Sequence, residues 1–509
     1  MNITVREAAE AVDGKLLAGD PDARIRQISL NSRSIGEHTL FVPIIGEKVD
    51  AHRFLSGAFS EGAVCAFTSE HTSREELEKD TELKRILFGK DAEEATHPLP
   101  ALIAVHDTRG ALQALGRWMR ERKVSIPFVG VTGSVGKTTT REMIACALSS
   151  EKRVYATKGN SNSQVGVPIT VAETDPEAQI GVIELGMSEF GEMHCIAEVA
   201  RVNAAVMTNI GISHINQLKT QENILKEKLH ILDGTPDGTP LFLNGDDPLL
   251  KTISEERIHA YGIARGHRIP IVFYGTEENA DWRAEDIKLE EGLPCFRLRH
   301  PSGQEITCSL QVAGMHMVLN AAAAIAVSAY FGIDPLHAAA ALSRFSGVDG
   351  RGEIMEIGGI RVIDDSYNAA PASMKAGLHV LCDLPASGRR IAVLADMLEL
   401  GEQEKEYHRE VGEFIRKEKL RLDEVLLYGP LSVSIAEGIE GNRVGTGSAG
   451  AETEETGKDP CTLPAVRHFT DLEELCDTLL PELHPGDSVL IKGSNAMGLR
   501  RVIERLRKL

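Results

Sequence analysis

The segment IPFVGVTGSVGKTTT, residues 126–140, decides the fold of the central part of the chain. Its apolar start is typical of a buried strand, a glycine-rich turn follows, and the threonines open a helical pattern. The residues that share the apolar face of that helix are Met143, Ile144, Ala147 and Leu148. A strand, a glycine-rich turn and a helix in this order predict an α/β domain with an anion-binding loop.

The turn carries the residue types that a phosphate-binding loop needs. Its glycines lie at positions 130, 133 and 136, whereas the strict Walker-A spacing would place a glycine at Val131. Gly133 and Gly136 still let the backbone approach a phosphate closely. Lys137 can then reach the β- and γ-phosphate oxygens, and Thr138 can ligate Mg²⁺. An ordinary glycine-rich turn capped by threonines is the alternative, and the agreement of strand, loop and helix favours the phosphate loop.

Three more apolar runs, RVYAT, IGVIE and AAVMT, are candidate buried strands of the same sheet. Each is followed by polar residues: residues 157–162, then Glu184, then residues 209–214. In a doubly wound parallel sheet, ligands bind at the edge where the carboxyl ends of the strands meet. Glu184 is therefore a candidate second ligand for Mg²⁺, with turn capping as the alternative. His214 taken alone is more often a structural histidine than a ligand.

A second α/β series begins near Gly350. The strand candidates IRVID, RIAVLAD, DEVLLYG and SVLIKGS alternate with helical stretches. Their polar ends are Asp364, Asp365, Asp396, Gly429 and Lys492. Before residue 124 the chain mixes short strands and turns, and the charged residues 74–85 are typical of a solvated helix. The Gly/Thr/Glu-rich residues 441–460 are expected to form a flexible surface loop.

Composition limits the kind of protein that this chain can be. At 509 residues, we expect about three or four domains of roughly 150 residues each. The 55 basic and 75 acidic residues give a net charge of −20, which argues against a nucleic-acid or anionic-membrane surface. No apolar run approaches the roughly 20 residues of a membrane span. We expect no signal peptide at the start, because it carries charge early and has no apolar run, and Thr4 and Glu7 predict a helix capping box there instead. The eight scattered cysteines indicate reduced thiols in the cytoplasm.

The stretch ILKEKLHIL, residues 224–232, raises a separate question. On a helix its isoleucines and leucines form one stripe, and Lys226, Glu227 and His230 lie on the opposite side. Lys228 lies near the middle of the apolar stripe. Periodicity alone favours a lysine that extends its ammonium to water along an apolar stem. The alternative is a buried amine, whose pKa falls and which, once neutral, can take up CO₂ to become an anionic carbamate and a metal ligand.

The order of several motifs resembles a known family. These motifs are GVTGSVGKTT, TKGNSNSQVGVPIT, ELGMSEFGEM, TNIGISHI, NGDD, GMHMVLNAAAA, DDSYNAAPASM, ADMLELG and KGS. Together they are similar to the Mur ligase family, from about Ser32 to Ser494, which is nearly the whole chain. The stretches DDSYNAAPASM and ADMLELG point to the branch that joins D-alanyl-D-alanine to UDP-N-acetylmuramoyl-tripeptide (UDP-MurNAc-tripeptide) in peptidoglycan precursor synthesis.

This resemblance implies an α/β fold of three domains. Residues 1–123 would bind the UDP end of the substrate, residues 124–347 would bind ATP on a parallel sheet of P-loop type, and residues 348–509 would form a Rossmann-like domain. It implies that a substrate carboxylate attacks the γ-phosphate of ATP, and that the amine of D-Ala-D-Ala then attacks the acyl phosphate. Phosphoryl transfer of this kind needs charge neutralisation and positioning more than a covalent protein group. The family also implies a cytoplasmic monomer.

The resemblance assigns roles to particular residues. Those that would contact ATP are Gly133, Ser134, Gly136, Lys137, Thr138, Thr139, Asn244, Arg351 and Asp365. Thr138 and Glu184 would hold one Mg²⁺ ion and His214 a second, and Lys228 falls where the family has a carbamoylated lysine. Those that would contact the other substrates are Ser32, Arg33, Asn160, Asn162, Tyr367 and Asp396. The chain departs from the family pattern at Asn31, Ser163, Met317, Ala395 and Asn495. The last departure leaves the site of D-Ala-D-Ala open, with Glu399 as a further candidate.

Other activities remain possible at this point. One is another amide ligase of the superfamily, either the enzyme that adds the third peptide residue or a folylpolyglutamate synthase. The N-terminal stretch NSRSIGEHTLFVPIIGE speaks against the folate enzyme, and the absence of a DNPR stretch speaks against the third-residue enzyme. A different class is a P-loop protein that uses ATP as a conformational switch. Whether the acceptor peptide ends in lysine or diaminopimelate is not determined by the sequence.

Overall fold

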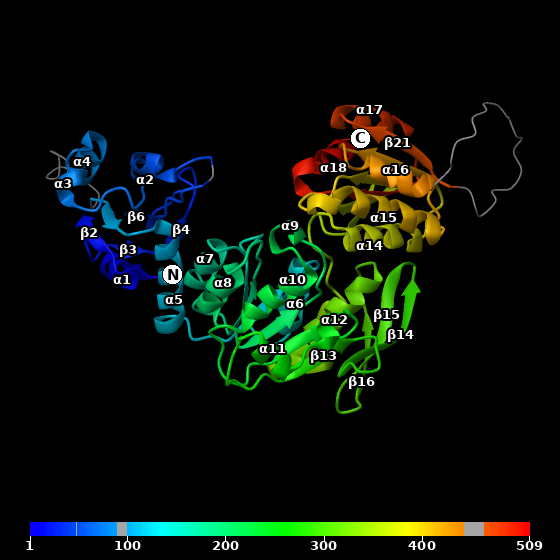
Figure 1. Ribbon diagram of the computed structural model, residues 1–509, viewed down its shortest axis with the longest axis horizontal. Helices are drawn as coiled ribbons and strands as arrows, with labels where there is room; N and C mark the ends of the chain where they lie inside the picture. The colour runs from blue at the N-terminus through cyan, green and yellow to red at the C-terminus, as the bar shows by residue number, and fades with distance from the viewer. Residues whose placement is uncertain (47, 89–98, 442–462, 509) are drawn as a thin grey trace, which may run out of the picture.

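The computed structural model describes the chain except for residues 47, 89–98, 442–462 and 509. Three α/β domains follow one another along the chain, and the central one lies between the other two (Figure 1). The loop expected at residues 441–460 lies outside the described residues, apart from Gly441. The domain boundaries after residues 123 and 347 stay a prediction. Each falls between the end of a helix and the start of the next sheet.

The N-terminal domain is a small sheet flanked by short helices. Its strand order is β2 (Lys15–Ala18), β7 (Ala101–Ala104), β6 (Cys65–Thr68), β5 (Thr39–Phe41) and β4 (Gln27–Ser29), and β1 (Ile3–Thr4) pairs with β3 (Arg24–Ile25) beside it. Its helices are α1 (Val5–Ala11), α2 (Leu55–Ser60), α3 (Arg74–Leu77), α4 (Thr81–Phe88) and α5 (Thr108–Arg122). The capping box predicted at the start of α1 is confirmed, because the side chains of Thr4 and Glu7 each accept from the backbone N–H of the other.

The solvated helix predicted at residues 74–85 is wrong in detail. Two helices, α3 and α4, occupy this stretch. The first ends at Leu77, and Asp80 caps the second by accepting from the N–H groups of Glu82 and Leu83 at 3.0 Å. Leu77 and Leu83 are buried against the sheet side of the domain. The many charged residues of this stretch favoured a fully solvated helix, although a surface helix needs an apolar residue only at every third or fourth position to be partly buried.

The central domain is built on one long sheet. Its strand order is β16 (Glu305–Ser309), β15 (Leu293–Arg299), β14 (Trp282–Glu290), β13 (Ile271–Gly275), β12 (Leu241–Asn244), β11 (Ala204–Met207), β8 (Phe128–Thr132), β10 (Ile180–Glu184) and β9 (Val154–Ala156). The neighbouring strands from β9 to β14 pair in parallel, whereas β14 with β15 and β15 with β16 pair antiparallel. The helices that cover it are α6 (Lys137–Leu148), α7 (Gly166–Ala172), α8 (Glu192–Ala200), α9 (Ile215–Leu218), α10 (Gln221–Leu229), α11 (Glu255–Ala260), α12 (Met315–Tyr330) and α13 (Pro335–Leu342).

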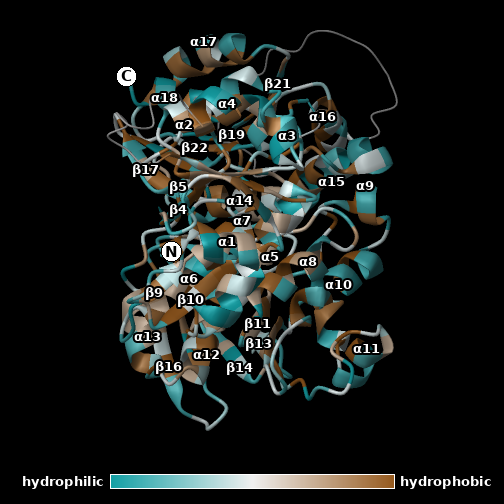
Figure 2. Cartoon of the chain, turned by 90° about the vertical axis from the view of Figure 1, so that its left-hand side faces the viewer, coloured by the Kyte–Doolittle hydropathy of each residue, from teal (hydrophilic) through white to brown (hydrophobic). Residues whose placement is uncertain are grey.

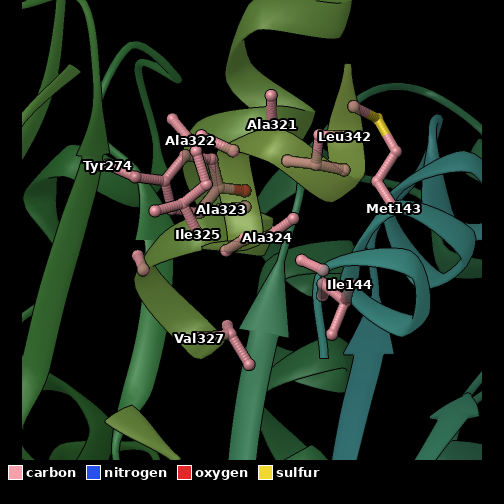
Figure 3. Packing of buried hydrophobic residues seen from close by; sticks show 14 of the residues in the cluster. Met143, Ile144, Tyr274, Ala321, Ala322, Ala323, Ala324, Ile325, Val327 and Leu342 are labelled. Carbon is pink, nitrogen blue, oxygen red and sulfur yellow. The ribbon is translucent and has the colours of Figure 1, made fainter. Parts of the chain in front are cut away.

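One face of this sheet is packed under α6, α12 and α13. The helix face predicted for α6 is confirmed, since Met143, Ile144, Ala147 and Leu148 are fully buried in this core. Residues 321–324 of α12 are all alanines, and Figure 3 shows them between Tyr274 and the side chains of α6. Small side chains let α12 lie close to α6, which fixes where the glycine-rich turn before α6 emerges from the sheet.

The C-terminal domain repeats the doubly wound plan. Its strand order is β17 (Glu353–Ile357), β18 (Ile360–Asp365), β22 (Ser488–Lys492), β19 (Arg390–Ala395), β20 (Glu424–Tyr428) and β21 (Ala465–Phe469), with only the β17–β18 pair antiparallel among the described pairs. One face packs under α14 (Pro371–Asp383), α15 (Glu404–Lys417) and α16 (Val433–Glu440), and the other under α17 (Leu472–Glu482) and α18 (Arg500–Leu506). The covering helices carry both hydrophilic and hydrophobic residues, as amphipathic helices do (Figure 2). Within the described ranges, none of the helices combines the length and the apolar character needed to span a membrane.

Gly181 on β10 is required by the ring of Phe128 on β8. The two residues are paired across the strands, and a Cβ at position 181 would lie 2.1 Å from two carbons of that fully buried ring. We therefore expect Gly181→Ala to lower the free energy of unfolding by about 1–3 kcal/mol, as overpacked cores do. Urea unfolding followed by circular dichroism measures this change.

Gly57→Ala is the matched control, because Gly57 lies inside α2 and no described atom comes within 4 Å of the Cβ that alanine would add. It should be neutral or stabilise by up to about 1 kcal/mol. Phe128→Leu added to Gly181→Ala should recover part of the loss. Equal unfolding curves for Gly181→Ala and the unmodified protein would contradict this account of β10.

Candidate active site

A cavity of about 490 Å³ lies at the carboxyl-terminal edge of the central sheet, and residues of the C-terminal domain also line it. The predicted residues that border it are Ser134, Gly136, Lys137, Thr138, Thr139, Asn160, Asn162, Glu184, His214, Asn244, Arg351, Asp365 and Tyr367. All of them except Arg351 follow or end β8, β9, β10, β11, β12 and β18, whereas Arg351 lies between α13 and β17. The structure therefore brings together the strand ends that the sequence singles out.

Sequence reasoning misses several polar residues of this cavity. Glu192 opens α8, and His316 and Asn320 lie in the first turns of α12. Asn320 is tied to the phosphate-loop helix, because its Oδ1 accepts from the hydroxyl of Thr140 at 3.0 Å. All three lie inside the motifs ELGMSEFGEM and GMHMVLNAAAA. In the sequence, only their position inside these motifs could have identified the three residues as part of the site, because their residue types alone do not indicate it.

The glycine-rich turn is pinned by the end of β11. Gly133 has φ +147°, and a Cβ there would lie 1.9 Å from Oγ1 of Thr208, so only glycine fits. The amide groups of Ser134 and Val135 donate to the backbone carbonyl and side-chain oxygen of Asn209 at 3.0 and 2.9 Å. Gly136, with φ +84°, precedes α6 and provides no side-chain cap. The first N–H groups of α6 therefore point toward the cavity as an anion-binding site.

Glu184 is held in place by groups on three sides of its carboxylate. Thr138 donates its hydroxyl to Oε2 at 2.8 Å, and Asn162 donates its amide to Oε1 at 2.7 Å. The guanidinium of Arg141 lies 3.5 Å from Oε2. The hydroxyl of Thr138 and the carboxylate of Glu184 are hard oxygen donors beside the phosphate loop, and such donors suit Mg²⁺. These two residues fit one magnesium ion.

Lys137 and Lys228 meet at one backbone oxygen. Nζ of Lys137 donates to the carbonyl of Gly133 at 2.9 Å, and Nζ of Lys228 donates to the same carbonyl at 3.0 Å. Lys228 is 1 % exposed, so its amine does not reach water along an apolar stem. Burial, and then the charge of Lys137, lowers the pKa of Lys228 well below its usual value, although Glu227 acts in the opposite direction. Of the two interpretations of this lysine, the structure favours the buried amine.

The prediction that Glu227 lies on the polar side of α10 is wrong. Its side chain is buried, and Oε1 accepts from the backbone N–H of Met193 at 3.1 Å. The physical reason is that the N-cap residue of α8 is Gly191, which has no side chain to cap the helix. The carboxylate of Glu227 supplies this missing acceptor from a neighbouring helix.

The surroundings of His214 favour its neutral form, which can bind a metal ion. It has φ +63° and precedes α9, and its Nδ1 lies 3.4 Å from Oε2 of Glu399 without the alignment of a hydrogen bond. Burial, and then the charges of Lys228 and Lys137, lowers the pKa of His214 to about 4. A neutral imidazole keeps the lone pair that a metal ion binds.

The C-terminal domain contributes a cation and an ion pair to the cavity. The guanidinium of Arg351 lies 3.9 Å from the centre of the Tyr367 ring. Nζ of Lys492 donates to Oδ2 of Asp365 at 2.5 Å and to the carbonyl of Asn368 at 3.1 Å. On the central-domain side, Asn244 donates to the carbonyl of Thr208 at 3.0 Å, which joins this site to the strand that pins the loop.

Three predicted substrate-binding residues do not border the cavity. Asp396 is buried, and its Oδ1 accepts from the N–H groups of Leu431 and Ser432 at 3.1 and 2.7 Å, so its carboxylate caps a turn. Ser32 and Arg33 lie in the N-terminal domain between β4 and β5, and Arg33 is exposed. These last two could meet only a part of a substrate that extends far from the phosphate loop.

Comparison with known proteins finds the same family in both later domains. Residues 131–328 match the Mur ligase middle domain, and residues 350–495 match the Mur ligase, glutamate ligase domain. The chain is 34 % identical to UDP-N-acetylmuramoyl-tripeptide–D-alanyl-D-alanine ligase of Bacillus subtilis strain 168 over 510 residues, which covers 99 % of this chain and 98 % of the relative. It is 30 % identical to the Escherichia coli K12 protein of the same name, over 86 % of this chain and 89 % of the relative.

Solved structures agree with the sequence comparison. MurF from Acinetobacter baumannii superposes with a TM-score of 0.82 at 25 % identity, covering 100 % of this chain and 99 % of that one. MurF from Thermotoga maritima in complex with ADP superposes with a TM-score of 0.73 at 25 % identity, covering 95 % and 97 %. A folylpolyglutamate synthase from Mycobacterium tuberculosis shares only the fold, with a TM-score of 0.56 at 17 % identity and 77 % of this chain covered.

The buried amine of Lys228 should destabilise the folded protein at neutral pH. In the unfolded chain the pKa of this lysine is about 10.4, and in the folded protein it is lower. At a pH between these two pKa values the unfolded chain binds more protons than the folded protein, so the free energy of unfolding rises with pH. We expect Lys228→Met to raise the free energy of unfolding by about 1–2 kcal/mol near pH 7.5. The gain should shrink toward pH 10. Urea unfolding in CO₂-free, Mg²⁺-free buffer measures it.

Lys226→Met is the control, since Lys226 lies on the same helix and is exposed. Its stability should differ little from that of the unmodified protein at any pH in this range. A loss of stability in Lys228→Met would mean that the hydrogen bond to Gly133 outweighs the burial of the amine.

Proposed function

The chain belongs to the Mur ligase family, and from this premise we propose that it joins D-alanyl-D-alanine to UDP-MurNAc-tripeptide at the expense of ATP. The products are UDP-MurNAc-pentapeptide, ADP and phosphate, for peptidoglycan synthesis. The observation that carries the proposal is similarity to ligases of this name over 99 % of the chain, N-terminal domain included. The folylpolyglutamate synthase covers 77 % of the chain, and the ligase that adds diaminopimelate superposes with a TM-score of 0.52 at 15 % identity.

The cavity suits activation of a carboxylate by ATP. The N–H groups at the start of α6 and the side chain of Lys137 hold the phosphates, while Arg351 adds a cation from the C-terminal domain. The carboxylate of the tripeptide attacks the γ-phosphorus, ADP leaves, and an acyl phosphate forms. The amine of D-Ala-D-Ala then attacks the acyl carbon, loses a proton, and phosphate departs.

Magnesium neutralises the phosphate charge in this reaction. Thr138 and Glu184 would hold one ion, and the neutral imidazole of His214 would hold a second together with Lys228. For that role Lys228 is carbamoylated: its neutral amine adds to the carbon of CO₂ and loses a proton, which yields an anion with two oxygen donors. The depressed pKa and the burial of Lys228 support this modification, because only the neutral amine reacts.

The domain layout suits a long substrate. Asn160 and Asn162 border the phosphate-loop cavity, and Tyr367 faces it from the C-terminal domain. Ser32 and Arg33 lie in the N-terminal domain, which Figure 1 shows on the far side of the central domain from the C-terminal one. In the proposal, Arg33 meets the diphosphate and the peptide carboxylate reaches the cavity. Asp396 would have to give up its backbone contacts to bind D-Ala-D-Ala. The enzyme acts as a cytoplasmic monomer.

Phosphate release tests the proposed reaction directly. With ATP, Mg²⁺ and UDP-MurNAc-tripeptide, we expect phosphate to appear in a 1:1 ratio to the new amide, because both arise from one acyl phosphate. Release should fall at least about 100-fold without D-Ala-D-Ala or with L-Ala-L-Ala in its place. Lysine and diaminopimelate tripeptides are assayed side by side. Phosphate release that is indifferent to the dipeptide would indicate an ATP-driven switch instead.

Lys228→Ala tests the proposed carbamate. We expect turnover to fall by at least about 1000-fold, since an anionic metal ligand is lost, and to recover in part when formate or acetate is added. Lys226→Ala, on the exposed side of α10, should keep its activity and show no response to these carboxylates. Full activity in Lys228→Ala would exclude a metal-binding role for this side chain.

A further inference from the structure

A second convergence of ligand atoms lies where α8 packs against the end of α10. His194 is in the first turn of α8, His230 starts η2 (His230–Leu232), and Asp233 follows it. Nδ1 of His194 lies 2.6 Å from Oδ2 of Asp233, and Nδ1 of His230 lies 2.7 Å from the same oxygen. The two rings are edge to face, with an interplanar angle of 84°. All three ligand atoms lie within 4.8 Å of one another.

Both imidazoles aim Nδ1 at the same carboxylate oxygen, Oδ2 of Asp233. The carboxylate can only accept, so each Nδ1 carries a hydrogen and donates it to Oδ2. A single divalent cation can replace both hydrogens, because their loss leaves each nitrogen with a lone pair directed toward the carboxylate, beside one shared oxygen. We propose that His194, His230 and Asp233 bind zinc(II).

The geometry needs only a small adjustment to accept the ion. In a tetrahedral zinc site, with Zn–N and Zn–O bonds of about 2.0–2.1 Å, neighbouring ligand atoms lie about 3.3 Å apart. The nitrogen–oxygen separations must therefore open by less than an ångström from 2.6 and 2.7 Å. The side chain of His194 is 55 % exposed, so it can move by this amount and leave a fourth position to water. The side chain of Asp233 is mostly buried, at 14 % exposure.

The donor set selects the metal. Two imidazole nitrogens and one carboxylate oxygen suit a borderline ion such as zinc, whereas Mg²⁺ and Ca²⁺ prefer oxygen ligands. Two other groups of three potential ligands occur among the described residues. In one, His52 already accepts from the N–H of Ser69 through Nε2, and the other consists of carboxylates alone. Neither aims two nitrogens at one point.

Zinc at this site would fasten together the two helices beside the catalytic cavity. The first turn of α8 carries Glu192, which borders the cavity, and α10 carries Lys228 two residues before His230. The hydrogen bond from the N–H of Met193 to Glu227 joins the same two helices a short way along. The zinc ligands themselves do not border the cavity. The ion would therefore support the position of these helices and take no part in the reaction.

Cobalt(II) can take the place of zinc(II), and its visible absorption shows the geometry of its ligands. The full-length protein is stripped with a chelator, its phosphate-loop site is filled with excess Mg²⁺ and a non-hydrolysable ATP analogue, and cobalt(II) is titrated in. We expect one equivalent to bind with the intense visible absorption of tetrahedral cobalt, and zinc(II) to abolish that absorption. His194→Ala and Asp233→Asn should weaken binding by at least about 100-fold.

His337→Ala is the matched control. Nδ1 of His337 lies 2.7 Å from Oε1 of Glu151, so it forms an exposed histidine–carboxylate pair without a second histidine in the group. Its cobalt affinity should equal that of the unmodified protein. Zinc should raise the thermal midpoint of the unmodified protein and of His337→Ala, and leave His194→Ala unchanged. Equal affinities in His194→Ala and His337→Ala, or binding only at millimolar metal, would overturn the proposal.

Discussion

The carbonyl oxygen of Gly133 accepts hydrogen bonds from Lys137 and from Lys228, so two amines meet at one point inside the protein. Two positive charges that share one acceptor repel each other strongly where water cannot screen them. Loss of solvent lowers the pKa of both amines, but Glu184 favours the charged form of Lys137, and the shift of Lys228 is the large one. One amine is thus suited to bind phosphate, and the other is suited to react as a neutral nucleophile.

This pairing depends on a backbone that only glycine can adopt. The turn at Gly133 passes so close to Thr208 that any side chain would collide with it, and Asn209 holds the next amide groups. The end of β11 therefore decides where the carbonyl of Gly133 points. The same strand end leads to His214, which is kept neutral by burial and by the two lysines. Loop, lysines and histidine form one electrostatic unit.

A protein with a net charge of −20 can bind anionic substrates because cations are placed locally around the cavity. Lys137 and Arg351 come from two domains and border one cavity, and the start of α6 adds backbone N–H groups. Because Arg351 and Asp365 reach the cavity from the C-terminal domain, the site is complete only when the two domains are together. Movement of one domain relative to the other would assemble or separate it.

The sequence by itself determined the local elements. The strand, turn and helix of residues 126–148, the apolar face of α6 and the capping box at Thr4 all follow from short-range rules, because propensity, periodicity and backbone sterics act within a few residues. The motif order also indicated the family. The edge at which the strand ends meet followed from the right-handed topology of parallel sheets.

Only the tertiary structure decided what lies across from each side chain. Periodicity placed Lys228 on the apolar stripe of its helix, but a long side chain can either reach water or stay inside, and the packing of the phosphate loop over it settled which. Glu227 was misplaced because the uncapped start of α8 lies far from it in sequence. Asp396 turned inward to cap a turn, and His194 came to face His230 and Asp233. Each outcome depends on contacts between distant segments, which no local pattern encodes.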